Sequence, residues 1–267
     1  MERTFNDWIT VTKLRFLSIT RYILGIESKS VFPPKDYKLV FEEDFKKLDP
    51  EIWGVGLPWG VVSENWLMYY DNTPDCVVAN DMLHLYTKYK PKEFDSRVTI
   101  PFGVGAIFSK QLWQYGWFEI EAQLPEGKNL WPAIWLTGAW PPEIDIMEAY
   151  SENGSGMKSK YMGLEDWKIQ PNLHFGEPDS MMRFGADNHP IQEATNKIVK
   201  YTLHWTKDFI KIYYDGHLIL KTTSPKLLEW YNKENDPMSL LLNNGVMDRC
   251  ADDSTFKVKS VKIFQKL

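Results

Sequence analysis

Short runs of alternating apolar and polar residues dominate the chain from Tyr37 onward. Such runs are typical of β-strands, whose successive side chains point to opposite faces of a sheet. They recur at sheet-like intervals, with turn residues between them, as at 37–41, 81–89, 117–123 and 209–214. Long helical patterns are missing from this region. The pattern therefore predicts an all-β fold, a jelly-roll sandwich of two antiparallel sheets.

Three local signals add detail to this prediction. Asp215-Gly216 lies between two apolar runs and predicts a two-residue hairpin, because both residues tolerate the positive φ angles of a type I′ turn. Glu126-Gly127 predicts a second hairpin or tight turn. A short helical turn is expected within residues 225–232.

The first part of the chain has a different pattern. Val11, Leu14, Leu17 and Leu24 lie at near-helical spacing, and two consecutive prolines at 33–34 end the segment. We treat residues 1–34 as an N-terminal extension and residues 35–267 as one jelly-roll domain. The extension could be a short helix packed on the domain, a partner-binding segment or a partly disordered arm, and we favour the packed helix.

Composition narrows the classes of function. Aromatic residues make up 15% of the chain, including 12 Trp, which is more than one core needs and suggests an aromatic binding surface. A net charge of −5 without a Lys/Arg cluster argues against binding nucleic acid. No apolar run is long enough for a membrane span, and no secretory signal is visible. Cys76 and Cys250 could form one disulfide or remain two buried thiols.

The densest chemical signal is the segment Glu143-Ile-Asp145-Ile-Met-Glu148. In a regular strand Glu143 and Asp145 share one face, while Ile144 and Ile146 point into the layer beneath. Glu148 would fall on the opposite face. One extra residue at a β-bulge near position 147 would return it to the face of the other two acids, and we predict that bulge.

Three acids on one sheet face repel one another, which lowers the stability of the fold. Because folding gains nothing from this arrangement, it indicates a functional site. One carboxyl should then keep its proton near neutral pH while another stays charged, which is the division that glycoside hydrolysis requires. In a retaining mechanism the two principal carboxyl groups lie about 5–5.5 Å apart. A solvated acidic strand or a calcium site is the alternative, and the flanking tryptophans make a sugar cleft the better interpretation.

The segment resembles family 16 of the glycoside hydrolases, whose hallmark is Glu-x-Asp-x-x-Glu on a bulged strand of a jelly roll. Further parts of the chain resemble the family's strands in order, at 39–45 with Trp53, 115–119, 124–127, 131–136, 172–176, 204–205, 215–216 and 256–264. The resemblance covers roughly residues 37–265. It implies that residues 35–267 are a catalytic domain with a concave substrate cleft, and that no organic cofactor is required. Structural calcium on the opposite face remains open.

By the family's pattern, Glu143 would be the nucleophile, Asp145 its assistant and Glu148 the general acid/base. Cleft positions of the family match Trp131, Trp135, Trp140 and His174, although Trp131 and Trp135 could instead belong to the core. The region of Asn65 and Tyr70 resembles the one with which β-glucanase members grip sugars on the glycone side.

The resemblance implies a retaining endo-acting hydrolase of a β-1,3 or mixed-linkage β-glucan. Galactan-cutting members, active on agar, porphyran or carrageenan, share the same strand and are an alternative. Sulfated substrates would favour basic cleft residues, for which Arg97, Lys110, Arg183 and Arg249 are available. A non-catalytic glycan-binding protein and a transglycosylase are two more candidates. We expect a monomer, secreted or located at the cell envelope, whose partner is a polysaccharide.

Overall fold

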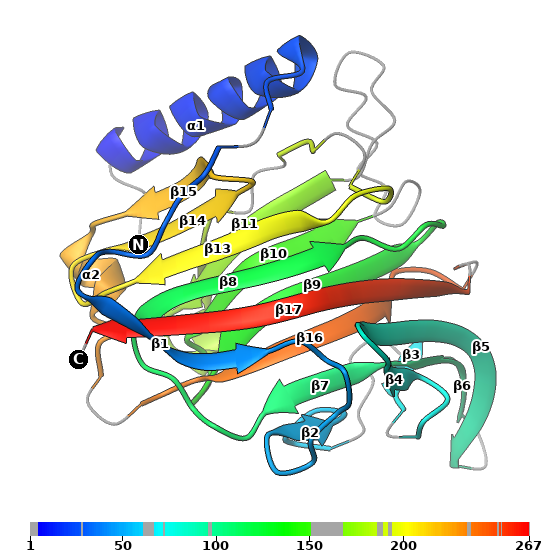
Figure 1. Cartoon of the computed structure of the whole chain (residues 1–267). Helices are drawn as coiled ribbons and strands as arrows, with labels where there is room; N and C mark the ends of the chain where they lie inside the picture. The colour runs from blue at the N-terminus through cyan, green and yellow to red at the C-terminus, as the bar shows by residue number, and fades with distance from the viewer. Residues whose placement is uncertain are drawn as a thin grey trace.

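The structure is a computed structural model. It describes residues 5–27, 29–60, 67–71, 73–95, 98–150, 168–185, 189–191, 194–233, 236–249, 251 and 253–266. Two twisted sheets lie against each other, with the helix α1 along one side (Figure 1). The predicted two-sheet sandwich is therefore confirmed.

Ten of the described strands form the first sheet, which has the central order β15-β14-β13-β8-β17-β5-β6-β3. β1 pairs with β17 and β4 pairs with β5. Among the described pairs of this sheet, only β3 and β6 run parallel. Along the path the bounds are β15 (His217–Thr222), β14 (Ile210–Tyr214), β13 (Val199–Trp205), β8 (Gly116–Gln123), β17 (Ser254–Lys266), β5 (Leu83–Asp95), β6 (Val98–Val104) and β3 (Met68–Tyr70), with β1 (Tyr37–Glu43) and β4 (Val77–Ala79) beside it.

Seven described strands form the second sheet, in the order β12-β11-β10-β9-β16-β7-β2. Their bounds are β12 (Met182–Gly185), β11 (Lys168–Phe175), β10 (Glu143–Tyr150), β9 (Leu130–Thr137), β16 (Ser239–Val246), β7 (Ala106–Ser109) and β2 (Trp53–Val55). The three described helices are α1 (Phe5–Leu24), the 3-10 helix η1 (Pro178–Ser180) and α2 (Pro225–Leu228). α2 confirms the helical turn expected within residues 225–232.

The two turn predictions have different outcomes. Asp215 and Gly216 connect β14 and β15 with φ angles of 44° and 74°, so the predicted hairpin is confirmed. Of the two alternatives at Glu126-Gly127, the hairpin is wrong, although the chain does bend at residues 127–129, where Gly127 has a φ angle of 125°. The preceding strand β8 belongs to the first sheet and the following strand β9 to the second, so this connection crosses between the sheets.

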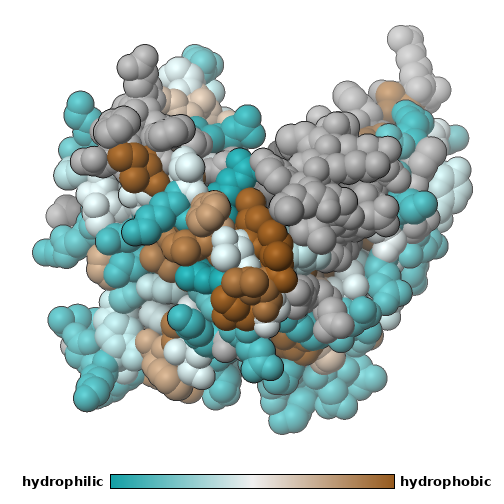
Figure 2. All heavy atoms as spheres, turned by 90° about the horizontal axis from the view of Figure 1, so that it is seen from above, coloured by the Kyte–Doolittle hydropathy of each residue, from teal (hydrophilic) through white to brown (hydrophobic). Residues whose placement is uncertain are grey.

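The N-terminal helix α1 packs on the edge strand β15. Leu14 and Ser18 are buried on its inner face, whereas Leu24 in the last turn is 66% exposed. The chain then runs along the β14–β15 turn, where the Lys29 amide donates to the Asp215 carbonyl at 2.8 Å. A Cβ at Gly216 would lie 1.9 Å from the Lys29 carbonyl oxygen, so this approach requires glycine. Figure 2 views the molecule from the side of α1 and shows hydrophobic side chains among hydrophilic ones.

These contacts agree with the packed-helix alternative for the extension. The division of the chain at residue 34 stays a prediction. In the part of the chain that the structure describes, no helix is both long and apolar enough to cross a membrane. Cys76 is buried and forms no disulfide with a described residue. Cys250, its partner in the disulfide alternative, lies outside the described residues, so both alternatives for the two cysteines stay predictions.

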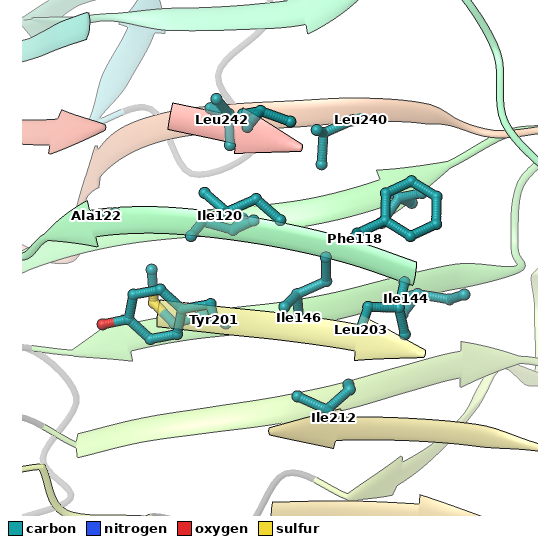
Figure 3. Packing of buried hydrophobic residues seen from close by; sticks show 14 of the residues in the cluster. Phe118, Ile120, Ala122, Ile144, Ile146, Tyr201, Leu203, Ile212, Leu240 and Leu242 are labelled. Carbon is teal, nitrogen blue, oxygen red and sulfur yellow. The ribbon is translucent and has the colours of Figure 1, made fainter. Parts of the chain in front are cut away.

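The main core lies between the sheets. One layer comes from β8, β13 and β14 and the other from β10 and β16, and their apolar side chains interdigitate (Figure 3). Ile144 and Ile146 of β10 are fully buried in this core, as strand alternation predicts. The opposite face of β10 is therefore left for the acidic side chains.

Candidate active site

The predicted bulge is present in the middle of β10. Against β9, Asp145 pairs with Trp135 and Met147 pairs with the next residue, Ile134, so Ile146 is the extra residue. The register against β11 shifts over the same interval, between Asp145 and Glu148. Ile146 and Met147 are both buried in the core. Because two consecutive side chains face inward, Glu148 returns to the face that Glu143 and Asp145 occupy.

A cleft of about 340 Å³ lies over this face of the second sheet. Glu143, Asp145 and Glu148 all line it. The remaining lining residues come from neighbouring strands and connections: Leu57, Trp59, Tyr70, Trp131, Ala133, Trp135, Trp140, Tyr150, Asn172, His174, Met181, Arg183 and Asn243. The structure thus brings together every candidate catalytic and sugar-binding residue that it describes. Asn65 and Arg97 lie outside the described residues, and neither Lys110 nor Arg249 lines the cleft.

Three donors hold the carboxyl group of Glu148. The Trp131 indole donates to Oε1 at 3.1 Å, and the Tyr150 hydroxyl donates to the same oxygen at 2.8 Å. Gln170 Nε2 donates to Oε2 at 3.3 Å. The Trp131 ring also stacks on Tyr150, with centroids 5.9 Å apart. Trp131 therefore lines the cleft and contacts an acid, and it also packs against the buried cluster around Met68 and Leu130, so both alternatives for it hold in part.

Glu143 and Asp145 form a second group with His174, which β11 places opposite Glu143. His174 Nε2 lies 3.2 Å from Asp145 Oδ2 and 3.7 Å from Glu143 Oε1. The same nitrogen lies 2.7 Å from Asn172 Nδ2. Behind the strands, the Tyr231 hydroxyl donates to the carbonyls of His174 and Glu143 at 2.6 and 3.2 Å. Tyr231 thereby ties the β10 and β11 backbones together at the site.

Burial and mutual repulsion determine how this pair of carboxyl groups ionises. Burial, followed by the Asp145 carboxylate, raises the pKa of Glu143 to about 10. Burial, followed by the Glu148 carboxylate, raises the pKa of Asp145 well above its usual range. Neighbouring carboxyl groups that are taken out of water cannot both carry charge comfortably. Glu143 and Asp145 therefore share at least one proton at neutral pH in the unliganded site.

Aromatic side chains form the walls of the cleft. Trp135 donates from its indole to Asn243 Oδ1 at 2.8 Å, and its ring meets Trp59 edge-on with centroids 5.9 Å apart. Trp59 and Trp140 are 53% and 52% exposed. Trp135 lines the cleft and also packs against the buried cluster of Leu57, Ala106 and Leu241. The predicted Tyr70 lines the cleft too.

Sequence reasoning missed several residues of the site. Trp59, Tyr150, Asn172 and Asn243 come from four separate parts of the chain. Tyr150 carries a usable signal, since it lies two residues after Glu148 and so on the same strand face. No sequence signal identifies Trp59 or Asn243, because only the order of the strands in the sheet brings these residues to the cleft.

The acids and the histidine could also hold a metal ion. Ligand atoms of Glu143, Asp145 and His174 lie within 4.8 Å of one another, and no second group of this kind occurs among the residues that the structure describes. Calcium prefers six to eight oxygen ligands. Two carboxylates and an imidazole nitrogen better suit a transition metal, so this group does not correspond to the expected structural calcium.

The family model for glycosyl hydrolases family 16 matches residues 69–254. The chain is 26% identical over 172 residues to the endo-1,3-1,4-beta-glycanase ExsH of Rhizobium meliloti, covering 61% of this chain and 33% of that protein. It is 32% identical over 131 residues to a beta-1,3-glucan-binding protein of Penaeus monodon, covering 44% of this chain and 33% of that protein. The chain thus spans a third of the length of both curated relatives.

A crystal structure of a variant of SCLam, described as a non-specific endo-beta-1,3(4)-glucanase, superposes with a TM-score of 0.71 at 25% identity. The alignment covers 90% of this chain and 98% of that chain. The shared jelly roll and the family match over more than half of the sequence lead to one conclusion. The chain belongs to glycosyl hydrolases family 16.

Proposed function

We propose that the protein is a retaining endo-acting glycoside hydrolase that cleaves internal β-linkages of a polysaccharide, namely a β-1,3 or mixed-linkage β-glucan. The observation that carries the proposal is the bulge in β10, which turns three carboxyl groups toward one cleft with aromatic walls. The names of ExsH and SCLam support the choice of β-glucan.

Each acid has a distinct role in this proposal. Glu143 attacks the anomeric carbon and forms a covalent glycosyl-enzyme, while Glu148 protonates the departing oxygen and then activates water. Asp145 carries the proton that Glu143 and Asp145 share. We assign the proton to Asp145 because its side chain is 4% exposed against 19% for Glu143, so the charged form costs more there. A protonated Asp145 leaves Glu143 charged and able to attack.

The surroundings of Glu148 suit a group that gains and loses a proton. Its Oε1 contacts the hydroxyl of Tyr150, which can donate to a carboxylate and accept from a carboxylic acid. Trp131 and Gln170 hold the carboxyl group in one orientation during both steps. The contacts therefore fit a residue that acts first as an acid and then as a base.

No organic cofactor takes part in the proposed reaction, and structural calcium remains a separate proposal. We expect the protein to act as a monomer, secreted or at the cell envelope, because a polysaccharide of this kind is met outside the cell.

Glycan binding without hydrolysis is the second candidate, since one relative is named a beta-1,3-glucan-binding protein. The presence of all three carboxyl groups in the cleft favours hydrolysis.

The test is the release of reducing ends from laminarin and mixed-linkage β-glucan, with agarose, porphyran and carrageenans as comparison substrates. We expect activity on a β-glucan that Glu143→Gln and Glu148→Gln reduce by orders of magnitude. The control is Glu229→Gln, which changes an exposed acid outside the cleft. Proton NMR of the first products should show the β-anomer. Binding of β-glucan without release of reducing ends would favour the second candidate.

A further inference from the structure

Two buried oxygen atoms in the cleft have no hydrogen-bond partner. Asp145 is 3% exposed and Asn172 is 1% exposed, and both residues line the cleft. Neither Asp145 Oδ2 nor Asn172 Oδ1 accepts a hydrogen bond from any residue that the structure describes. A buried oxygen that has lost its contact with water is costly unless another group compensates it. A positively charged ligand at this place would provide that compensation.

The spacing of the neighbouring ligand atoms suits a small metal ion. His174 Nε2 lies 3.2 Å from Asp145 Oδ2 and 3.7 Å from Glu143 Oε1, and the ligand atoms of the three residues lie within 4.8 Å of one another. In a tetrahedral zinc site the metal–ligand distances are about 2.0–2.2 Å, which places neighbouring ligand atoms roughly 3.3–3.6 Å apart. All three atoms can therefore reach one zinc ion after small movements of their side chains.

Strand pairing holds these ligand atoms in place before any ion binds. In the register of β10 and β11, Glu143 pairs with His174 and Asp145 pairs with Asn172. The Tyr231 hydroxyl joins both strands through the carbonyls of Glu143 and His174. Ligands on rigid strands lose little conformational freedom when they bind an ion. The three ligand side chains are therefore preorganised for binding.

The types of ligand atom select the class of ion. Calcium and magnesium prefer oxygen ligands alone, whereas zinc, cobalt and copper also bind imidazole nitrogen. Two carboxylates in addition balance the charge of a divalent ion. We propose that Glu143 Oε1, Asp145 Oδ2 and His174 Nε2 bind one divalent transition metal ion, such as zinc, and that this ion reversibly inhibits hydrolysis. A fourth position stays open for water, whose proton Asn172 Oδ1 can accept.

The bound ion and the proposed reaction exclude each other. Zinc binds the deprotonated forms of its ligands, so it replaces the proton that Glu143 and Asp145 share. Its bond to Glu143 Oε1 withdraws the electron pair with which the nucleophile attacks the anomeric carbon. The inhibition therefore rests on the proposed function, whereas binding of the ion does not. The roles assigned to the acids above belong to the metal-free protein.

Cobalt absorption tests the binding site without any glycan. Co²⁺ substitutes for zinc and absorbs visible light strongly when four ligands surround it. The full chain is treated with EDTA, separated from the chelator and titrated with Co²⁺. We expect a visible absorption band that stoichiometric zinc removes.

Variants locate the ion. Asp145→Asn and His174→Gln should each weaken zinc binding by about tenfold or more in calorimetry, because each alters a ligand. His84→Gln is the matched control, since His84 does not line the cleft, and it should bind zinc as the parent does. Circular dichroism checks that every variant is folded.

Inhibition is measured on a β-glucan that the parent protein hydrolyses. We expect zinc to raise the apparent KM, because the ion and the glycan compete for the cleft, and EDTA to restore the activity. The His84→Gln variant should be inhibited as strongly as the parent.

Three results would overturn the proposal. One is absence of the cobalt band together with absence of zinc binding in calorimetry. Another is zinc binding of unchanged affinity in both Asp145→Asn and His174→Gln, which would place the ion outside the cleft. The third is zinc bound by these ligands while hydrolysis continues at its full rate. A cobalt band in a protein that hydrolyses no glycan would instead contradict the proposed function and support the metal site.

Discussion

The hydroxyl of Tyr214 donates a 3.0 Å hydrogen bond to the carbonyl oxygen of Ile146, the extra residue in the bulge of β10. Tyr214 belongs to the first sheet and Ile146 to the second, so this bond crosses the sandwich. A bulge interrupts the regular strand pairing around it, and Tyr214 supplies a partner from outside the sheet. The first sheet thus helps to hold the strand geometry that directs Glu148 into the cleft.

Tyr214→Phe should lower the free energy of unfolding by about 0.5–1.5 kcal/mol, because it removes a buried hydrogen bond between the two sheets. It should also reduce kcat through the changed position of Glu148. Urea unfolding and steady-state kinetics measure the two effects. Tyr201→Phe is the matched control, since the buried Tyr201 hydroxyl has no partner among the described residues. Equal losses in both variants would contradict the role given to the bond.

Glu143→Gln should stabilise the protein although it abolishes hydrolysis. Burial and mutual repulsion raise the pKa of both carboxyl groups, that of Glu143 to about 10 against an ordinary value of 4.5, so the pair of Glu143 and Asp145 binds more protons when the chain is folded. Stability is therefore lost as the pH rises through this interval, and the glutamine variant avoids the loss. Each pH unit of this interval lowers the free energy of unfolding by about 1.4 kcal/mol, which corresponds to roughly 3–5 °C in melting temperature.

Thermal unfolding at pH 4 and pH 8 checks this expectation. The difference in melting temperature between Glu143→Gln and the parent should be positive at pH 8 and small at pH 4. Glu229→Gln, at an exposed position, should show no such dependence. A variant that is less stable than its parent at pH 8 would contradict the shared-proton assignment.

His174→Gln should move the acidic limb of the kcat/KM profile to higher pH. The charge of His174 lowers the pKa of Glu143 and so favours the ionised nucleophile. Without the histidine, the pair of Glu143 and Asp145 holds its protons to higher pH. If His174→Gln lowers activity equally at every pH, the electrostatic role of His174 is contradicted, and the residue only positions its neighbours in the site.

Trp59→Ala and Trp140→Ala should raise KM by about two- to tenfold and leave kcat nearly unchanged. Both rings are half exposed and line the cleft, so they offer stacking surface to sugar rings away from the bond that is cleaved. Phe32→Ala, at an exposed aromatic residue outside the cleft, is the control. An equal change in KM for all three variants would contradict the proposal that Trp59 and Trp140 bind sugar rings in the cleft.

The chemistry of β10 could be predicted from sequence because it depends on one strand. Alternation fixes the faces of Glu143 and Asp145, and the extra residue between Asp145 and Glu148 requires a bulge if all three are to act together. Trp131 and Trp135 also share a face by alternation, although alternation does not reveal whether that face is the cleft or the core.

The remaining parts of the site depend on how strands pair. Asn243 contacts Trp135 only because β16 lies beside β9. Trp59 contacts Trp135 only because the strand before it, β2, pairs with β7 in the same sheet. The hairpin prediction at Glu126-Gly127 failed for the same reason, since turn residues do not reveal which sheet the next strand joins. Local patterns predict turns and faces, whereas the sheet partner is set by packing across the whole core.

The edge-on contact between Trp59 and Trp135 gives the protein a built-in optical reporter. Two indoles this close couple their electronic transitions, and one of them is half exposed at the place where a sugar ring would stack. Ligand that enters the cleft should change both the near-ultraviolet circular dichroism of the pair and its fluorescence. Occupancy of the cleft can therefore be followed in real time on the unlabelled protein, even in a Glu143→Gln variant that turns nothing over.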